Sequence, residues 1–191
     1  INIISKEIDR LFSLLQLQNV YDSNAFQETL FKISSEIREC DSSIIRGVFD
    51  KYLIEEVSNR RLVEAKSPFQ YAFFKNIGIN LNTRFKRYFF ARVEDFLATS
   101  TNSNMKHFIG DLVSRTGSVN GFHIEHILSY NDENLSLFND DEDVFEQERN
   151  RLGGILILKG KDNISSGNEP FKKKLKSYAN TLYWNETLRE D

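Results

Sequence analysis

The sequence predicts an α+β protein in which a helical bundle is followed by a smaller module of strands and helices. Prolines are rare: Pro68 is the one proline in the first hundred residues. Apolar residues recur there at helical spacing, whereas beyond Gly117 the pattern changes to short alternating and apolar runs. We therefore expect a helical domain over 1–116 and a second, mixed domain over 117–191.

Composition excludes several classes of protein. The chain has 191 residues, 40% of them hydrophobic, with 16 Phe, a net charge of −3 and a single cysteine, Cys40. One cysteine rules out a disulfide framework and a multi-cysteine zinc site, and it suits a reducing compartment such as the cytoplasm. No apolar run approaches the ~20 residues that a membrane span needs, so no membrane partner is expected.

The helices of the first domain are predicted from apolar residues spaced at i, i+3, i+4 and i+7. Ser5 is a plausible start for the first helix, because its hydroxyl oxygen can accept a free N–H of the first turn. Gly117 is expected to end the last helix. The predicted helical segments are 5–17, 24–39, 42–57, 81–98 and 104–115.

Two strands are predicted in the second domain. Residues 121–129 combine alternation with β-branched side chains, and residues 155–158 form a short apolar run typical of a buried strand. The other expected elements are a helix over 139–151 capped by Asn139, a loop over 159–167, and a helix over 169–180 with Pro170 near its start.

Charge is segregated along this second domain. Residues 131–148 contain eight acidic and no basic side chains, whereas residues 149–176 contain eight basic and two acidic ones. The basic stretch is either a solvated face or a surface for phosphate backbones. The acidic stretch is a solvated helix, a lid or a surface for a partner.

Several polar residues of the second domain suit metal-assisted hydrolysis. Glu125 and His126 lie on the first predicted strand, and Asn163 lies in the loop after the second. A carboxylate and an amide supply the oxygen ligands that Mg²⁺ prefers. A histidine beside them can take a proton from water, because its pKa lies near neutrality.

The other histidines are more ambiguous. His123 precedes Glu125 by two residues, so both side chains point to the same face of a strand. It is either a further metal ligand or a hydrogen-bonded structural group. His107 falls on a predicted helix and is expected to be structural. Zinc held by His123 and His126 is disfavoured, since residues three apart on a strand point to opposite faces.

These motifs resemble a known family. The sequence reads His-Ile-Glu-His-Ile-Leu from His123, Leu-Gly-Gly-Ile-Leu-Ile-Leu from Leu152, and Asn-Ile-Ser-Ser-Gly-Asn-Glu-Pro-Phe-Lys-Lys-Lys from Asn163. It is similar to the HNH-type (ββα-metal) nuclease domain at the C-terminus of GmrSD-like, modification-dependent restriction enzymes. The preceding segment 84–92 also resembles the helical part of that family. The resemblance is specific over 123–178.

The resemblance implies a helical bundle followed by an HNH-like ββα-metal module that frames one divalent ion, Mg²⁺ or alternatively Mn²⁺ or a similar ion. His126 matches the general base of the family. The resemblance implies Glu125 and Asn163 as the metal ligands, and His123 is the candidate for a further one. Asn168 and Lys174 match family positions that shape the loop and the closing helix, and the candidate substrate contacts are Lys172, Lys173, Lys174 and Asn168.

Two positions depart from the family pattern. Gly154 stands where the family has an asparagine that supports the loop of the site, and Ser129 stands where it has a proline. We expect the first change to make the loop less rigid. Neither change removes an implied ligand or the implied base.

The implied function is metal-dependent cleavage of DNA by the effector domain of a bacterial restriction or anti-phage protein. The resemblance also implies an N-terminal NTPase or sensor domain in the same protein or complex. One alternative is a non-catalytic module that binds DNA or a protein on a degenerate nuclease fold. A weaker one is a helical signalling or scaffold domain with an incidental motif.

Overall fold

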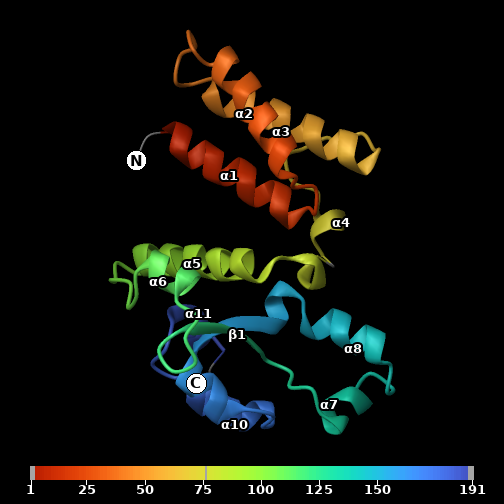
Figure 1. The fold of residues 1–191 in the computed structure, drawn as a ribbon, viewed down its shortest axis with the longest axis vertical. Helices are drawn as coiled ribbons and strands as arrows, with labels where there is room; N and C mark the ends of the chain where they lie inside the picture. Colours follow the sequence, from red (N-terminus) through yellow and green to blue (C-terminus); the bar gives the residue numbers. More distant parts are fainter. Residues whose placement is uncertain (1–2, 76, 189–191) are drawn as a thin grey trace. The chain divides into compact units, whose positions relative to one another are not determined.

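The computed structural model describes residues 3–75 and 77–188 (Figure 1). The chain divides into two compact units, Ile1–Leu81 and Asn82–Asp191. The described part of the first unit is helical, and the second combines helices with a two-stranded sheet. This mixture agrees with the predicted α+β class. Within the described residues, none of the helices is long and apolar enough to cross a membrane.

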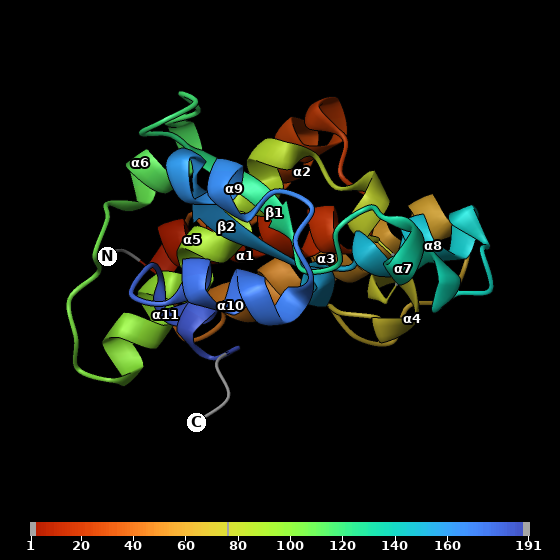
Figure 2. The ribbon, with the colours of Figure 1, turned by 90° about the horizontal axis from the view of Figure 1, so that it is seen from below.

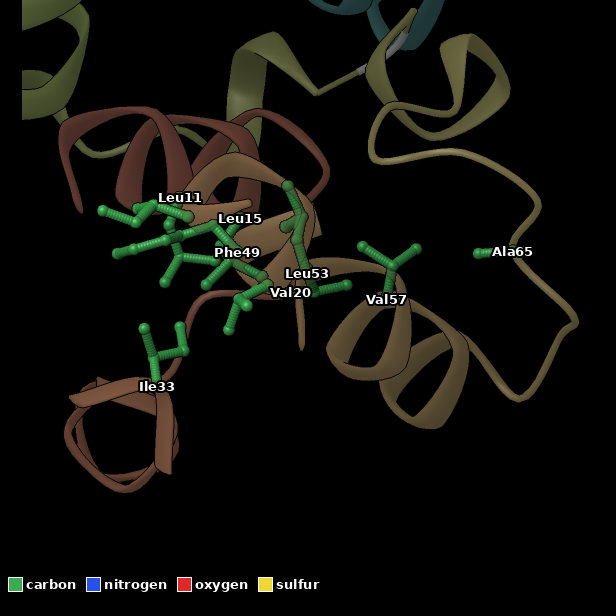
Figure 3. Close-up of a cluster of buried hydrophobic side chains, with 10 residues drawn as sticks. Leu11, Leu15, Val20, Ile33, Phe49, Leu53, Val57 and Ala65 are labelled. Atoms are coloured by element: carbon green, nitrogen blue, oxygen red, sulfur yellow. The ribbon is translucent and has the colours of Figure 1, made fainter. Parts of the chain in front are cut away.

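The first unit is built on amphipathic helices, as the apolar spacing predicted. Figure 3 shows Leu11 and Leu15 beside Phe49 and Leu53, with Ile33 pointing toward them. All five are at most 2% exposed, so they form one core. The elements are α1 (Ile3–Leu17), α2 (Ser23–Glu36), α3 (Ile45–Arg61), α4 (Tyr71–Phe74) and the 3₁₀ helix η1 (Gly78–Asn80).

The second unit contains the sheet. Strands β1 (Phe122–His126) and β2 (Ile155–Lys159) pair antiparallel, with Phe122 opposite Lys159 and His126 opposite Ile155. Figure 2 shows the two strands side by side. The helical elements are α5 (Thr83–Ser100), α6 (Ile109–Ser114), α7 (Asp132–Ser136), α8 (Glu142–Arg149), η2 (Leu152–Gly154), α9 (Gly160–Ser166), α10 (Phe171–Tyr178) and α11 (Tyr183–Glu186).

Strand β2 is the centre of the second core. Its residues from Ile155 to Leu158 are at most 1% exposed, as expected for an apolar run covered on both faces. Leu156 and Leu158 pack against Tyr178 of α10. Helices α5, α9 and α11 also contact this strand. The sheet therefore holds the candidate site residues of β1 in a packed framework.

The compact units divide 35 residues earlier than the predicted boundary between 116 and 117, at Leu81 and Asn82. Helices α5 and α6 belong with the strands, because both contact β1. The carboxylate of Glu94 on α5 also accepts hydrogen bonds from the backbone N–H groups of Tyr183 (2.9 Å) and Trp184 (3.2 Å). These contacts join residues about ninety positions apart, so helical periodicity alone did not indicate them.

Several predicted elements differ in extent from the observed ones. The loop predicted over 159–167 was wrong, since it contains helix α9. The helix predicted over 139–151 is the shorter α8, and its cap is Asp141, whose carboxylate accepts the N–H of Val144 at 3.0 Å. Asn139 is not the cap, because its backbone is left-handed with φ of 56°.

The start of α5 provides a test of local stability. The side chain of Asn82 accepts the backbone N–H of Arg84 at 2.8 Å and so satisfies a free donor of the first turn. We expect Asn82→Ala to lower the free energy of unfolding by about 1 kcal/mol. Urea unfolding checks this, and Asn82→Ser, which keeps a capping oxygen, is the matched control. Equal losses in the two variants would contradict the capping role.

Candidate functional site

Strand β1 presents the predicted site residues on alternate faces. His123 and Glu125 share one face, whereas His126 lies on the other. His126 is also the last residue of the strand, opposite Ile155. The predicted acidic ligand Glu125 and the predicted base His126 are therefore consecutive in sequence, but their side chains lie on opposite faces of the strand.

Glu125 is the most enclosed of the predicted ligands. Glu125 is only 6% exposed and Lys174 only 1%. Oε1 of Glu125 forms an ion pair with Nζ of Lys174. The Tyr178 hydroxyl lies 3.4 Å from the same oxygen. Burial, followed by the negative charge of Glu125, raises the pKa of Tyr178 and keeps the phenol protonated. Glu125 is thus the acceptor of a buried polar cluster.

Lys174 also ties the strand to α10 through its backbone. Its ammonium donates to the carbonyl oxygen of His126 at 2.9 Å, in addition to the ion pair with Glu125. The neighbouring Lys172 and Lys173 are exposed. Helical geometry explains the difference, because Lys174 shares a face with Tyr178, four residues later. The ammonium of Lys174 is consequently buried. Contact with a substrate phosphate would require it to be at the surface.

His126 has a partner on another element. Its Nε2 lies 3.1 Å from Oδ1 of Asn150, the residue that caps the C-terminus of α8. Burial lowers the pKa of His126, and the hydrogen bond to Asn150 opposes this in part; the positive charge of Arg149 lowers it further. The ring is therefore predominantly neutral near pH 7, as a general base must be.

The other predicted residues, His123, Asn163 and Asn168, have contacts of their own. The ring of His123 is 3.3 Å from the carbonyl oxygen of Gly117. Asn163 is half-buried on α9, a helix that contacts both strands. Asn168 is exposed, and its carbonyl oxygen accepts a hydrogen bond of 3.4 Å from Asn131. The structure thus places Asn163 on an element adjacent to β1, and it ties Asn168 to the loop after β1.

Sequence reasoning gave no role to Asn150, and it did not foresee the contact that Lys174 makes. Asn150 was expected in a helix but had no assigned role, although it holds the ring of His126. Lys174 was assigned to the substrate, although it neutralises Glu125. The spacing of Lys174 and Tyr178 was a signal for a buried helical face, whereas nothing in the spacing of 24 residues indicated the contact between Asn150 and His126.

The donor types of the predicted ligands fit a hard divalent ion, since a carboxylate and an amide both offer oxygen. In the part of the chain that the structure describes, no three His, Cys, Asp or Glu side chains converge as a metal cluster. In addition, Lys174 places a competing positive charge on Glu125. An ion at Glu125 would have to share the carboxylate with that ammonium or displace it.

Gly154 approaches the end of α8 too closely for a side chain. A Cβ atom added there would lie 2.8 Å from the carbonyl oxygen of Arg149 and 3.0 Å from that of Glu148. Backbone atoms cannot easily move away from such a contact. The close packing of η2 against α8 therefore requires glycine at this position.

We expect Gly154→Asn to lower the free energy of unfolding by about 1–3 kcal/mol, the usual range for overpacking. Gly153→Asn is the matched control, because nothing lies within 4 Å of a Cβ atom built on Gly153. Chemical denaturation of the two variants measures the difference. If both asparagine variants are as stable as the wild type, the predicted clash is absent.

The fold and these residues define a mixed α+β domain whose first strand carries a half-buried histidine in contact with Asn150 and, on its opposite face, a buried carboxylate paired with Lys174. A comparison with protein families matches residues 67–191 to the C-terminal domain of the GmrSD restriction endonucleases. Because the match spans more than half of the chain and all of the second unit, the chain belongs to this family. The resemblance drawn from the motifs is thus confirmed. Comparison with curated proteins gave no match, and neither did comparison with solved structures.

Proposed function

We propose that this chain is a metal-dependent DNA endonuclease domain of the HNH type, with His126 as its general base. Its family consists of restriction endonucleases, which makes DNA the expected substrate. The observation that carries the proposal is the setting of His126: the ring is half-buried, its Nε2 lies 3.1 Å from Oδ1 of Asn150, and burial lowers its pKa. A ring with one nitrogen engaged retains the other for a proton from water.

In the proposed reaction, His126 accepts a proton from water, and the water oxygen forms a bond to phosphorus. One P–O bond of the phosphodiester breaks, and the leaving oxygen takes up a proton from solvent. Glu125 and Asn163 are the proposed ligands of Mg²⁺, with Mn²⁺ as an alternative and His123 as a further ligand, and the bound ion would stabilise the developing negative charge.

Exposed basic side chains supply a proposed contact surface for DNA. Lys172 and Lys173 lie on the exposed side of α10. A separate concave pocket of about 200 Å³ is lined by Lys106, Lys159 and Lys161, among other residues. Lysines neutralise phosphates without reading the sequence. We therefore expect binding with little sequence preference and with strong salt dependence.

The family also supports a larger context. We propose that the domain is the effector of a bacterial defence protein, and that an NTPase or sensor domain in the same protein or complex controls it. The acidic stretch 131–148 is in part neutralised at the end of α8, where Glu146 pairs with Arg149 and Glu148 with Arg151, which follows the helix, both at 2.7 Å. These local pairs favour a solvated helix over a lid.

Relaxation of a supercoiled plasmid by the purified chain tests the proposal. Incubations with EDTA, Mg²⁺ and Mn²⁺ are compared, and we expect nicked or linear products only with a divalent ion. Cleavage that persists in EDTA would contradict metal dependence. The full-length protein with nucleotide is assayed alongside, and absence of cleavage by both proteins would contradict the nuclease proposal.

The buried pair of Glu125 and Lys174 favours a second candidate, a non-catalytic module that binds DNA or a protein on the same fold. A carboxylate already paired with an ammonium is a poor metal ligand. This candidate predicts binding without cleavage under every metal condition. Fluorescence anisotropy with labelled duplex DNA over a range of salt concentrations measures the binding, and a salt-independent signal would exclude phosphate contacts.

A further inference from the structure

We infer that Asn150 is a positioning residue that holds the proton of neutral His126 on Nε2 and so makes Nδ1 the nitrogen that accepts the proton from water. The inference rests on the proposed function for its catalytic meaning. The tautomer itself is a property of the folded chain and is testable without any activity.

The orientation of the Asn150 amide is determined by its neighbours on α8. Its Nδ2 donates to the carbonyl oxygen of Glu146 at 2.8 Å and to Oε2 of the same residue at 2.9 Å. Both partners are acceptors, so a flipped amide would bring an oxygen against two oxygens. The amide nitrogen therefore faces Glu146, and Oδ1 faces His126.

The tautomer of His126 follows from this orientation. Oδ1 of Asn150 lies 3.1 Å from Nε2 of His126, and an amide oxygen can only accept a hydrogen bond. Nε2 must consequently carry a hydrogen. A neutral imidazole has one N–H, so Nδ1 is left with a lone pair.

Glu146 is in turn held in place from its other side. Its Oε1 accepts a hydrogen bond from Nη1 of Arg149 at 2.7 Å, and Nε of Arg149 donates to the carbonyl oxygen of Leu128 at 3.3 Å. Leu128 lies two residues beyond His126. The chain of contacts from Arg149 through Glu146 and Asn150 therefore fixes the ring and the backbone after β1 to the same helix.

Nitrogen-15 NMR of histidine-labelled protein measures the tautomer directly. Long-range proton–nitrogen correlations distinguish protonated from unprotonated ring nitrogens, and His126→Gln identifies the signals of residue 126. We expect Nε2 protonated and Nδ1 unprotonated in the wild type at neutral pH. The opposite tautomer in the wild type would overturn the inference, whether or not the chain cleaves DNA.

Asn150→Ala is the variant that tests the positioning role, and Gln147→Ala is its matched control, since it removes an amide from the same helix. In Asn150→Ala we expect a mixture of both tautomers and a kcat about 10- to 100-fold lower, the range for groups that orient a histidine. KM for DNA should not change. A tautomer and kcat equal to those of Gln147→Ala would overturn the inference.

The experiment separates the inference from the proposed function. If the wild type has the expected tautomer, loses it in Asn150→Ala and yet never cleaves DNA, the proposed nuclease activity fails and the positioning contact stands. If the wild type cleaves and Asn150→Ala cleaves equally well, the positioning role fails and the nuclease stands.

Discussion

His126→Ala is expected to reduce metal-dependent plasmid cleavage by about 10²- to 10⁴-fold, the contribution typical of a positioned general base. The variant removes the ring whose Nε2 is held by Asn150. It leaves the backbone carbonyl of residue 126 available to Lys174. Strand β1 and the buried pair of Glu125 and Lys174 should therefore persist, and the loss should appear in kcat.

His107→Ala is the matched control for this substitution. His107 is neither a proposed metal ligand nor the proposed base; its ring lies 4.9 Å from that of Phe122, and it lines the pocket of Lys106, Lys159 and Lys161, whose positive charges the substitution leaves in place. We expect this variant to cleave at nearly the wild-type rate and both variants to bind duplex DNA with unchanged affinity in anisotropy. Cleavage by His126→Ala at the wild-type rate would exclude it as the base, and a loss of DNA binding would assign it to substrate contact instead.

Lys174→Met is expected to lower the free energy of unfolding by about 3–5 kcal/mol, because it leaves the carboxylate of Glu125 buried without a cation. Methionine retains most of the aliphatic stem, so the loss is one of charge pairing more than of packing. Urea unfolding of the whole chain measures the effect. Lys173→Met, an exposed neighbour on α10, should change stability by no more than about 0.5 kcal/mol.

A double variant separates pairing from packing at this position. Glu125→Leu combined with Lys174→Met replaces both charges with apolar groups, and such replacements are often neutral or stabilising. We expect the double variant to be more stable than Lys174→Met alone. The single variant Glu125→Leu completes the comparison. If the stability lost in the double variant equals the sum of the losses in Glu125→Leu and Lys174→Met, the two side chains do not stabilise each other as a pair.

Glu125→Gln tests whether this carboxylate is also a metal ligand. Calorimetric titration with Mn²⁺ should show weaker binding in the variant if Glu125 ligates the ion. In that case Lys174→Met, where it remains folded, should bind Mn²⁺ more tightly than the wild type, because a competing cation has been removed. Unchanged Mn²⁺ affinity in both variants would assign Glu125 to the buried pair alone.

Local patterns in the sequence predicted much of the framework. Apolar residues at helical spacing indicated α1, α2, α3 and α5, and the apolar run before Lys159 indicated β2. The Glu-His pair on β1 and the motifs around it were sufficient to identify the family. These features depend on side chains within one turn or one strand of each other, so their spacing is visible in the sequence.

Only the tertiary structure shows which side chains of the candidate site contact one another. Lys174 was predicted to contact the substrate, but it is buried and paired with Glu125, 49 residues away in the sequence. A lysine is rarely buried unless it is paired, and a partner so distant in the sequence is not visible in local spacing. Asn150 meets His126 across 24 residues, and α5 joins the strands through contacts of similar or longer range. Sequence indicated which residues are candidates for the chemistry, whereas packing determined which of them are buried and paired, because a charge is buried at acceptable cost only where a partner is in place.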